Sequence, residues 1–140
     1  MFSQSVEYAL RAVVYMGMNP QRICTTEQIA ATTKVPLPYL HKLLKSLSKA
    51  RLVTSQRGVG GGNRLAIPAN KITVLEVVNA IEPILPIGYC PLGLVNHGIN
   101  LCPMHTKLNH AIEAIQDVLT QSTVQDLIDE PTTSIPMCGK

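Results

Sequence analysis

The stretch LVTSQRGVGGGNRLAIP, Leu52 to Pro68, places four glycines within five residues between two short apolar runs. The flanking residues 51–55 and 64–67 have the composition of two short strands. A phosphate-binding Walker loop would end in Gly-Lys-Ser/Thr, and a dinucleotide-binding turn would open a helix, so neither matches this loop. The stretch therefore predicts a β-hairpin. Two interpretations stay open: a wing whose glycines let the backbone approach DNA while Arg57 enters the minor groove, or a tight hairpin without such a role.

Helical patterns precede the hairpin. Apolar residues from Val6 onward recur at the spacing of a one-sided helix, which Asn19-Pro20 ends. The run TTEQ at 25–28 is typical of a capping box that opens a short second helix, and residues 34–36 predict a turn. A third helix begins near Pro38, with a core stripe at Leu40, Leu43, Leu44 and Leu47. Two helices joined by a tight turn and followed by a hairpin indicate a winged helix-turn-helix.

The predicted DNA-reading surface combines the outer face of the third helix with the hairpin. That helix face carries lysines, a histidine and a tyrosine but no acidic residue. The second helix of a helix-turn-helix unit lies in the major groove of DNA. The expected DNA contacts are Pro38, Tyr39, His41, Lys42, Lys45, Arg57, Gly60, Gly61, Asn63 and Arg64.

The charge distribution agrees with this location. Residues 1–70 carry nine Lys/Arg and two acids, a balance of +7, whereas residues 71–140 carry three Lys and seven acids, a balance of −4. A basic half joined to an acidic half indicates that the first half meets a polyanion. Chance clustering of solvated charges is the alternative.

The second half predicts a sensor loop and a dimerisation helix. Thr73 and Glu76 form another capping box, opening a helix to about residue 81. Residues 83–102 form a loop rich in Pro, Gly and Asn, and a helix then runs from Pro103 to about Gln121. Its apolar seam, with coiled-coil-like steps, suggests a partner helix: Leu108, Ile112, Ile115 and Leu119. A short helix after Thr123 and a tail from 131 complete the chain.

The fold class expected is thus mostly α with a small β-hairpin wing. The predicted domains are a winged helix-turn-helix at 1–82, a sensor loop at 83–102, a dimerisation helix with a short terminal helix at 103–130, and a tail at 131–140. No apolar run approaches the roughly 20 residues needed to span a bilayer, and the first residues do not resemble an export signal. We therefore expect a cytoplasmic protein without a membrane segment.

The loop before the long helix contains the residues most suited to metal chemistry. Cys102 occupies the expected N-cap of the helix that Pro103 opens, where the positive helix end favours a thiolate. His105 lies one turn further, and Cys90 can fold back across the loop. Two thiolates and an imidazole suit an iron–sulfur centre or zinc. In a cytosolic chain, metal binding or redox sensing is a better explanation of these cysteines than a structural disulfide framework.

The chain resembles the bacterial winged-helix regulator family that includes the iron–sulfur regulator IscR, the nitric oxide sensor NsrR and the cysteine-metabolism repressor CymR. The resemblance extends from about residue 1 to residue 130. Its motifs are EYALR at 7–11, PYLHKLL at 38–44, LVTSQRGVGGG at 52–62, ITVLEVV at 72–78 and the cysteine loop. It implies a homodimer in which the long helix of each chain crosses onto the partner.

The resemblance also implies a cofactor site, with one departure. Cluster-binding members carry three loop cysteines, and Cys90 and Cys102 match the outer two, but Asn96 stands at the middle position. His105 matches a histidine that completes a 2Fe–2S site in some members. Glu7 matches an acidic ligand supplied by the first helix of the other subunit. The implied ligand set is therefore Cys90, Cys102, His105 and Glu7.

The function expected is a homodimeric DNA-binding transcription regulator, a repressor, that recognises an inverted-repeat operator. It would sense redox state, nitric oxide or iron supply through one 2Fe–2S cluster per subunit. Heme or zinc in the same site, and a metal-free Cys90–Cys102 disulfide switch, are the alternatives. An enzyme is disfavoured because the sequence contains neither Cys-x-x-Cys nor His-Glu-x-x-His. A winged fold reused for protein contacts alone is disfavoured by the basic face of the third helix.

Overall fold

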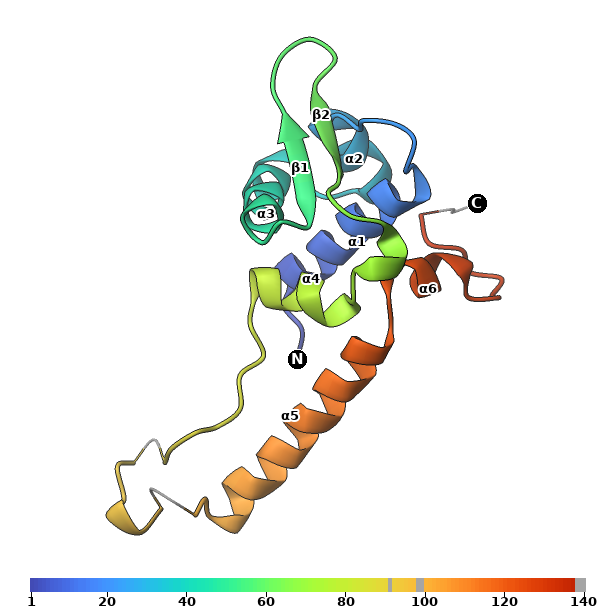
Figure 1. The fold of residues 1–140 in the computed structure, drawn as a ribbon. Coiled ribbons are helices and arrows are strands. Elements are labelled where there is room, and N and C mark those ends of the chain that lie inside the picture. Colours follow the sequence, from blue (N-terminus) through green and yellow to red (C-terminus); the bar gives the residue numbers. More distant parts are fainter. Residues whose placement is uncertain (91, 98–99, 138–140) are drawn as a thin grey trace.

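The computed structural model describes residues 1–90, 92–97 and 100–137, and Cys138 lies outside these ranges. The described part is mostly helical with one antiparallel hairpin, as predicted (Figure 1). Its helices and strands are α1 (Gln4–Met18), α2 (Thr26–Thr33), α3 (Leu37–Lys49), β1 (Val53–Gln56), β2 (Gly62–Leu65), α4 (Val74–Ile81), α5 (Pro103–Gln121) and α6 (Val124–Asp129). Short 3-10 turns, η1 (Ala69–Lys71) and η2 (Val95–His97), interrupt the connections.

Three helices begin with reciprocal capping boxes, in which a threonine side chain and the residue three positions later satisfy each other's backbone N–H groups. The pairs are Thr25 with Gln28, Thr73 with Glu76, and Thr123 with Asp126. The first two confirm the sequence prediction. At the third, the backbone N–H of Thr123 donates to the Asp126 carboxylate and holds the pKa of that carboxyl below its ordinary value. These caps fix where α2, α4 and α6 start.

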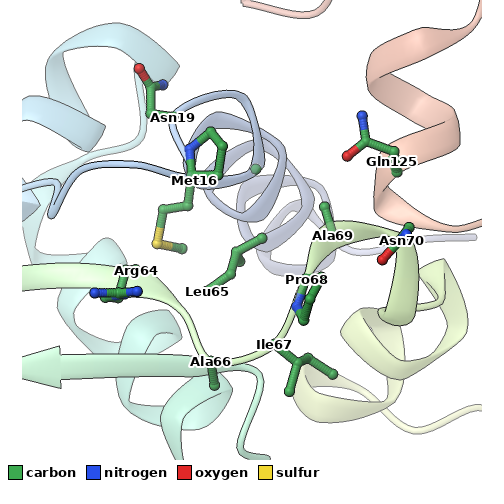
Figure 2. Close-up of a pocket in the computed structure, with 12 residues that line it drawn as sticks. Met16, Asn19, Arg64, Leu65, Ala66, Ile67, Pro68, Ala69, Asn70 and Gln125 are labelled. Atoms are coloured by element: carbon green, nitrogen blue, oxygen red, sulfur yellow. The ribbon is translucent and has the colours of Figure 1, made fainter.

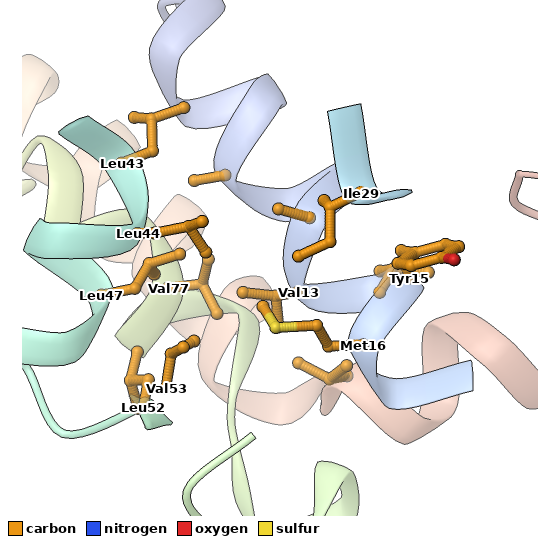
Figure 3. Close-up of a cluster of buried hydrophobic side chains, with 14 of the residues drawn as sticks. Val13, Tyr15, Met16, Ile29, Leu43, Leu44, Leu47, Leu52, Val53 and Val77 are labelled. Atoms are coloured by element: carbon orange, nitrogen blue, oxygen red, sulfur yellow. The ribbon is translucent and has the colours of Figure 1, made fainter. Parts of the chain in front are cut away.

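The core of the N-terminal half surrounds α1, which contacts α2, α3, α4 and α6. Figure 3 shows its side chains converging on the leucines of α3. The predicted stripe of α3 is confirmed, since all four of its leucines are buried. Gly17 permits close packing of α6 on α1, because a Cβ there would lie 2.9 Å from Ile128 Cδ1. The body on which the hairpin rests is therefore a tightly packed helical unit.

The hairpin starts and ends at residues other than those predicted. In its register Thr54 faces Arg64 and Ser55 faces Asn63. Arg51 adopts a left-handed conformation (φ 63°) and belongs to the turn after α3, so the first strand starts later than expected. The second strand starts at Gly62, earlier than expected, because Asn63 also pairs with Cys24: each backbone N–H donates to the other's carbonyl, at 2.8 and 2.7 Å.

The chain leaves the body after α4 and returns to it through α5. In Figure 1, α5 projects away from the winged unit, and residues 83–90 run beside it. Asn109 on α5 holds this segment by bonding both the N–H and the carbonyl of Ile87, at 2.7 and 3.0 Å. At the other end of α5, Val74 N donates to Ser122 O (2.8 Å) and Val124 N to Ile72 O (2.9 Å). Both ends of α5 are thereby attached to the rest of the chain.

None of the helices in the described ranges has the length and apolar character needed to cross a membrane.

Candidate nucleic-acid interface and sensor region

A groove of about 630 Å³ lies between α3 and the hairpin. Its walls come from the outer face of α3, the start of α2 and the inner face of the hairpin. Lys45, Lys49 and Arg57 line it, and none of the described residues in its lining is acidic. Such a basic concavity favours a polyanion, because every contributing charge has the same sign.

The outward residues of α3 are exposed because the opposite face of that helix is fixed in the core. Tyr39, His41, Lys42 and Lys45 all lie on the exposed side, with Tyr39 58% exposed. Pro38 lies in the first turn of α3, where backbone N–H groups have no partner within the helix, so the N–H that proline lacks is not needed. Of the predicted contacts on this helix, His41 and Lys45 line the groove directly.

The wing presents Arg57 at its tip. Gly58 and Gly60 adopt φ angles of 93° and 77°, which side-chain-bearing residues rarely adopt, and the tight turn depends on them. Val59 between them is fully exposed. The glycine-rich stretch therefore forms a narrow hairpin tip that extends beyond the helical body, with Arg57 beside the groove.

Asn63 lines the groove, as its predicted DNA contact requires, but its side chain is bonded within the fold. It is one of two buried polar residues in the described chain, at 4% exposure. Its amide donates to Cys24 O (3.3 Å) and Thr26 Oγ1 (3.2 Å) and accepts from Ser55 Oγ (2.7 Å). These bonds attach the hairpin to the start of α2. Asn63 is thus a positioning residue for the wing.

Arg64 lies on the other face of the hairpin. Neighbouring residues on a strand point to opposite faces, so Arg64 points away from the side on which Asn63 packs. It is exposed and lines two cavities separate from the groove, of about 390 and 320 Å³. A DNA contact of Arg64 remains a prediction, and Arg64 is not among the residues that line the groove.

The groove contains residues that the sequence analysis did not single out. Thr26 lies at the start of α2, and Gln56 ends β1 beside the groove. The position of Thr26 could have been inferred from the capping box at Thr25, which makes Thr26 the first residue of α2. The N-terminus of a helix presents N–H groups suited to phosphate. Gln56 had no comparable signal, since its position depends on the hairpin register.

The proposed metal ligands are only partly brought together in one chain. Cys102 Sγ lies 3.3 Å from His105 Nδ1, at the N-terminal end of α5, as the N-cap prediction requires. Cys90 is buried, and the thiols of Cys90 and Cys102 are both free. Within the described ranges, no three His, Cys, Asp or Glu side chains lie close enough to hold a metal ion. An iron–sulfur cluster takes four protein donors, and the described residues of one chain do not bring four together.

Glu7 is engaged elsewhere. Its carboxylate accepts a hydrogen bond from Arg11, one turn further along α1. Arg11 also lies over the ring of Tyr8, 5.4 Å from its centroid, and the Tyr8 ring meets Tyr39 edge-on at 6.4 Å. Metal binding by Glu7 would therefore require its carboxylate to leave Arg11. Through Tyr8, that arginine is connected to Tyr39 on the exposed face of α3.

The predicted dimer seam is divided between two environments. Every residue of α5, which the structure describes in full, is at least partly exposed. Ile112 and Ile115 line a pocket with residues of α1 and α4, and Leu119 packs on the small apolar cluster of Val6, Val74 and Val78. Leu108 is 48% exposed. The most exposed apolar side chains of α5 form a neighbouring stripe with it: Met104 (61%) and Val118 (64%).

Comparison with known proteins identifies the fold and the family. The structure superposes on CymR of B. subtilis, a global cysteine regulator, with a TM-score of 0.77 and 24% identity, covering 94% of this chain and 98% of CymR. IscR of T. potens gives 0.76 with 21% identity, covering 96% and 93%. These neighbours are winged-helix regulators, so the predicted fold class is confirmed.

Two curated relatives match by sequence. A predicted HTH-type transcriptional regulator of Aquifex aeolicus is 34% identical over 91% of both chains. Protein aau3 of Rhizobium meliloti is 30% identical over 90% of this chain and 83% of its own. Residues 2–130 match the Rrf2 family, described as iron-dependent transcriptional regulators. The chain therefore belongs to the Rrf2 family of DNA-binding transcription regulators, which confirms the predicted family and the prediction that it is not an enzyme.

Proposed function

We propose that this protein is a homodimeric repressor of the bacterial cytoplasm that recognises an inverted-repeat operator through α3 and the β1–β2 wing. The observation that carries the proposal is the groove between these elements, which is lined by three cations and, in the described chain, by no acidic residue. Lysines and arginines there would contact phosphates and supply most of the affinity. His41 and Tyr39, exposed on the same helix, are positioned to reach base edges.

Replacing Arg57 by alanine is expected to weaken operator binding about tenfold, equivalent to about 1.4 kcal/mol. The slope of log K against log salt should become shallower by about one unit, because one phosphate contact is lost. Fluorescence anisotropy with a labelled operator, titrated at several salt concentrations, measures both quantities. Lys71→Ala removes another exposed charge, from η1 and outside the groove, and serves as the control. Unchanged affinity and slope for Arg57→Ala would contradict the wing assignment.

Dimerisation is proposed to use the outward stripe of α5. Met104, Leu108 and Val118 recur at helical spacing and are about half exposed or more, although they are apolar. Burying such a stripe against a second copy of α5 removes apolar surface from water and stabilises the pair. A two-fold dimer would place two copies of α3 on one face, as an inverted repeat requires.

For sensing, we propose a site completed between subunits. Cys102 and His105 form a preassembled pair of donors at the start of α5. Cys90 of the same chain and Glu7 of the partner subunit would complete it. Thiolate and imidazole donors suit a 2Fe–2S cluster, which when bound reports oxidants, nitric oxide or iron supply; heme and zinc are the alternative occupants. The family description as iron-dependent regulators supports iron in this role.

An anaerobic absorption spectrum of freshly purified protein, with iron and acid-labile sulfide assayed on the same sample, tests this site. We expect visible charge-transfer bands and about two irons and two sulfides per subunit, as a 2Fe–2S cluster requires. The double variant Cys90→Ala/Cys102→Ala should lose both, whereas Cys24→Ala should retain them, because Cys24 is buried beside the hairpin. A Soret band would assign heme instead, and a cluster retained by the double variant would refute the ligand set.

A second candidate is a thiol switch without metal. Cys102 lies at a helix N-terminus with the imidazole of His105 at 3.3 Å, so a base stands beside its sulfur. One similar structure is described as an oxidized form of S. aureus CymR; it has a TM-score of 0.75 and 24% identity, covering 95% of this chain and 99% of that chain. A Cys90–Cys102 disulfide would lower the intact mass by about 2 Da, since two thiol hydrogens leave as the S–S bond forms. Iron-free protein that gains this bond with diamide, and changes its DNA affinity, would favour the switch.

A further inference from the structure

A second concavity lies behind the hairpin, away from the DNA-reading groove. It measures about 390 Å³ and is enclosed by the end of α1, the segment from β2 to η1, and α6 (Figure 2). The groove is lined by α3 and the inner face of the hairpin, and neither the described α3 residues nor Arg57 line this cavity.

The polar lining of the cavity carries a single charge. Arg64 supplies a guanidinium, and the amides of Asn19, Asn70 and Gln125 are neutral. Asn19 Nδ2 donates to Tyr15 O (2.8 Å) and Gln125 Nε2 donates to Asp129 (2.9 Å), so these two amides are held in fixed orientations. Asp129 itself lines a separate surface hollow together with Asp126 and Glu130.

The remaining lining is apolar. Met16 is 1% exposed and Ala69 is 8% exposed, so both belong to the core as well as to the cavity wall. Ile67 and Pro68 form a partly exposed rim. One cation with neutral amides beside an apolar wall is the composition of a site for a small amphipathic anion.

We propose that this cavity binds a small organic monocarboxylate with a compact apolar body. A guanidinium pairs with a carboxylate through two parallel hydrogen bonds, and one cation balances one negative charge. A dianionic phosphate would leave a charge uncompensated at this site. The volume lies near the lower end of the range for ligand pockets, roughly 300–1,000 Å³, which fits a single small molecule. Because the binding readout needs neither DNA nor cofactor, this inference is independent of the proposed function.

The test is calorimetric titration of the full-length protein at pH 7 with 4-methylpentanoate and with its uncharged isostere 4-methylpentanamide. We expect the carboxylate to bind at least tenfold more tightly than the amide. Arg64→Gln should weaken carboxylate binding at least tenfold, and so should Ile67→Glu, which places a negative charge on the exposed rim. Arg57→Gln, which removes an arginine from the wing tip, should leave it unchanged. Resonance shifts of Gly17 and Asn70 in an NMR titration locate the ligand.

Equal binding of the acid and the amide, or no binding of either, would overturn the proposal. So would carboxylate binding that survives Arg64→Gln with full affinity. If that variant kept carboxylate binding and lost operator affinity to the extent of Arg57→Gln, Arg64 would be a phosphate contact and the cavity assignment would fail.

Discussion

Replacing Leu40 by alanine is expected to lower the free energy of unfolding by about 2–5 kcal/mol. Leu40 is completely buried and lies between two exposed residues of α3, Tyr39 and His41. Truncation removes buried apolar surface and leaves a cavity at the point where the DNA-reading helix is anchored to α1. Equilibrium urea denaturation followed by circular dichroism measures the change. An accompanying fall in the thermal midpoint of about 3 °C per kcal/mol is expected for a domain of this size.

Leu37→Ala is the matched control on the same helix. Leu37 is 37% exposed, so the same truncation loses less buried surface and should cost well under half as much stability. Equal destabilisation by the two variants would show that α3 is not held through the leucine stripe. The comparison also separates the two functions of α3. Tyr39→Ala, at a 58% exposed position, should weaken DNA binding and cost only about 1 kcal/mol of stability, from the lost edge-on contact with Tyr8.

Introducing glutamate at both Met104 and Val118 is expected to convert the dimer to a monomer. The dissociation constant of the dimer should rise at least about 100-fold, because burying unpaired carboxylates between two helices is strongly unfavourable. Both side chains are more than half exposed in the single chain, so folding should be unaffected. Sedimentation velocity over a range of protein concentrations measures the equilibrium. Operator affinity should fall with it, because the two half-sites would be bound independently.

His110→Glu provides the control for this experiment. His110 is exposed on the same helix but lies off the apolar stripe, about a third of a turn from Met104 and about a quarter of a turn from Val118. This variant adds negative charge to α5 without entering the proposed contact, and it should remain dimeric. A dimer that survives Met104→Glu/Val118→Glu would refute the stripe as the interface. If substitutions at Ile112 and Leu119 instead dissociated the dimer, the originally predicted seam would be the correct one.

Much of the fold could be predicted because its determinants are local. The capping boxes at Thr25 and Thr73 mark helix starts through hydrogen bonds within four residues. Pro103 marks the start of α5 because proline fits the first turn of a helix, where its missing N–H costs no intrahelical bond. The leucine stripe of α3 follows from helical periodicity. The Cys102–His105 contact could also be anticipated, since residues three apart in the first turn share one helix face.

The rest depends on pairing that no local pattern encodes. Asn63 and Arg64 are neighbours in sequence, and which of them faces α2 is decided by the hairpin register and by the bridge to Cys24. A shift of one residue would exchange their roles. The position of Cys90 relative to Cys102 likewise depends on a long irregular segment. Similarly, the α5 seam was predicted from spacing alone, and spacing does not reveal that Leu119 packs on its own chain.

The short bridge between Thr73 and Thr123 has a mechanical consequence. It connects the end of α5 to the start of α4, so this bridge would be the pivot for any tilt of α5 against the body. At 1.5 Å per residue the 19 residues of α5 span about 28 Å, and a tilt of roughly 5° at the pivot displaces the far end by about 2.5 Å. With the proposed sensor site, a small displacement at Cys102 would therefore reach the body as a rotation of α5 at this bridge, and DNA bound at α3 would oppose that rotation.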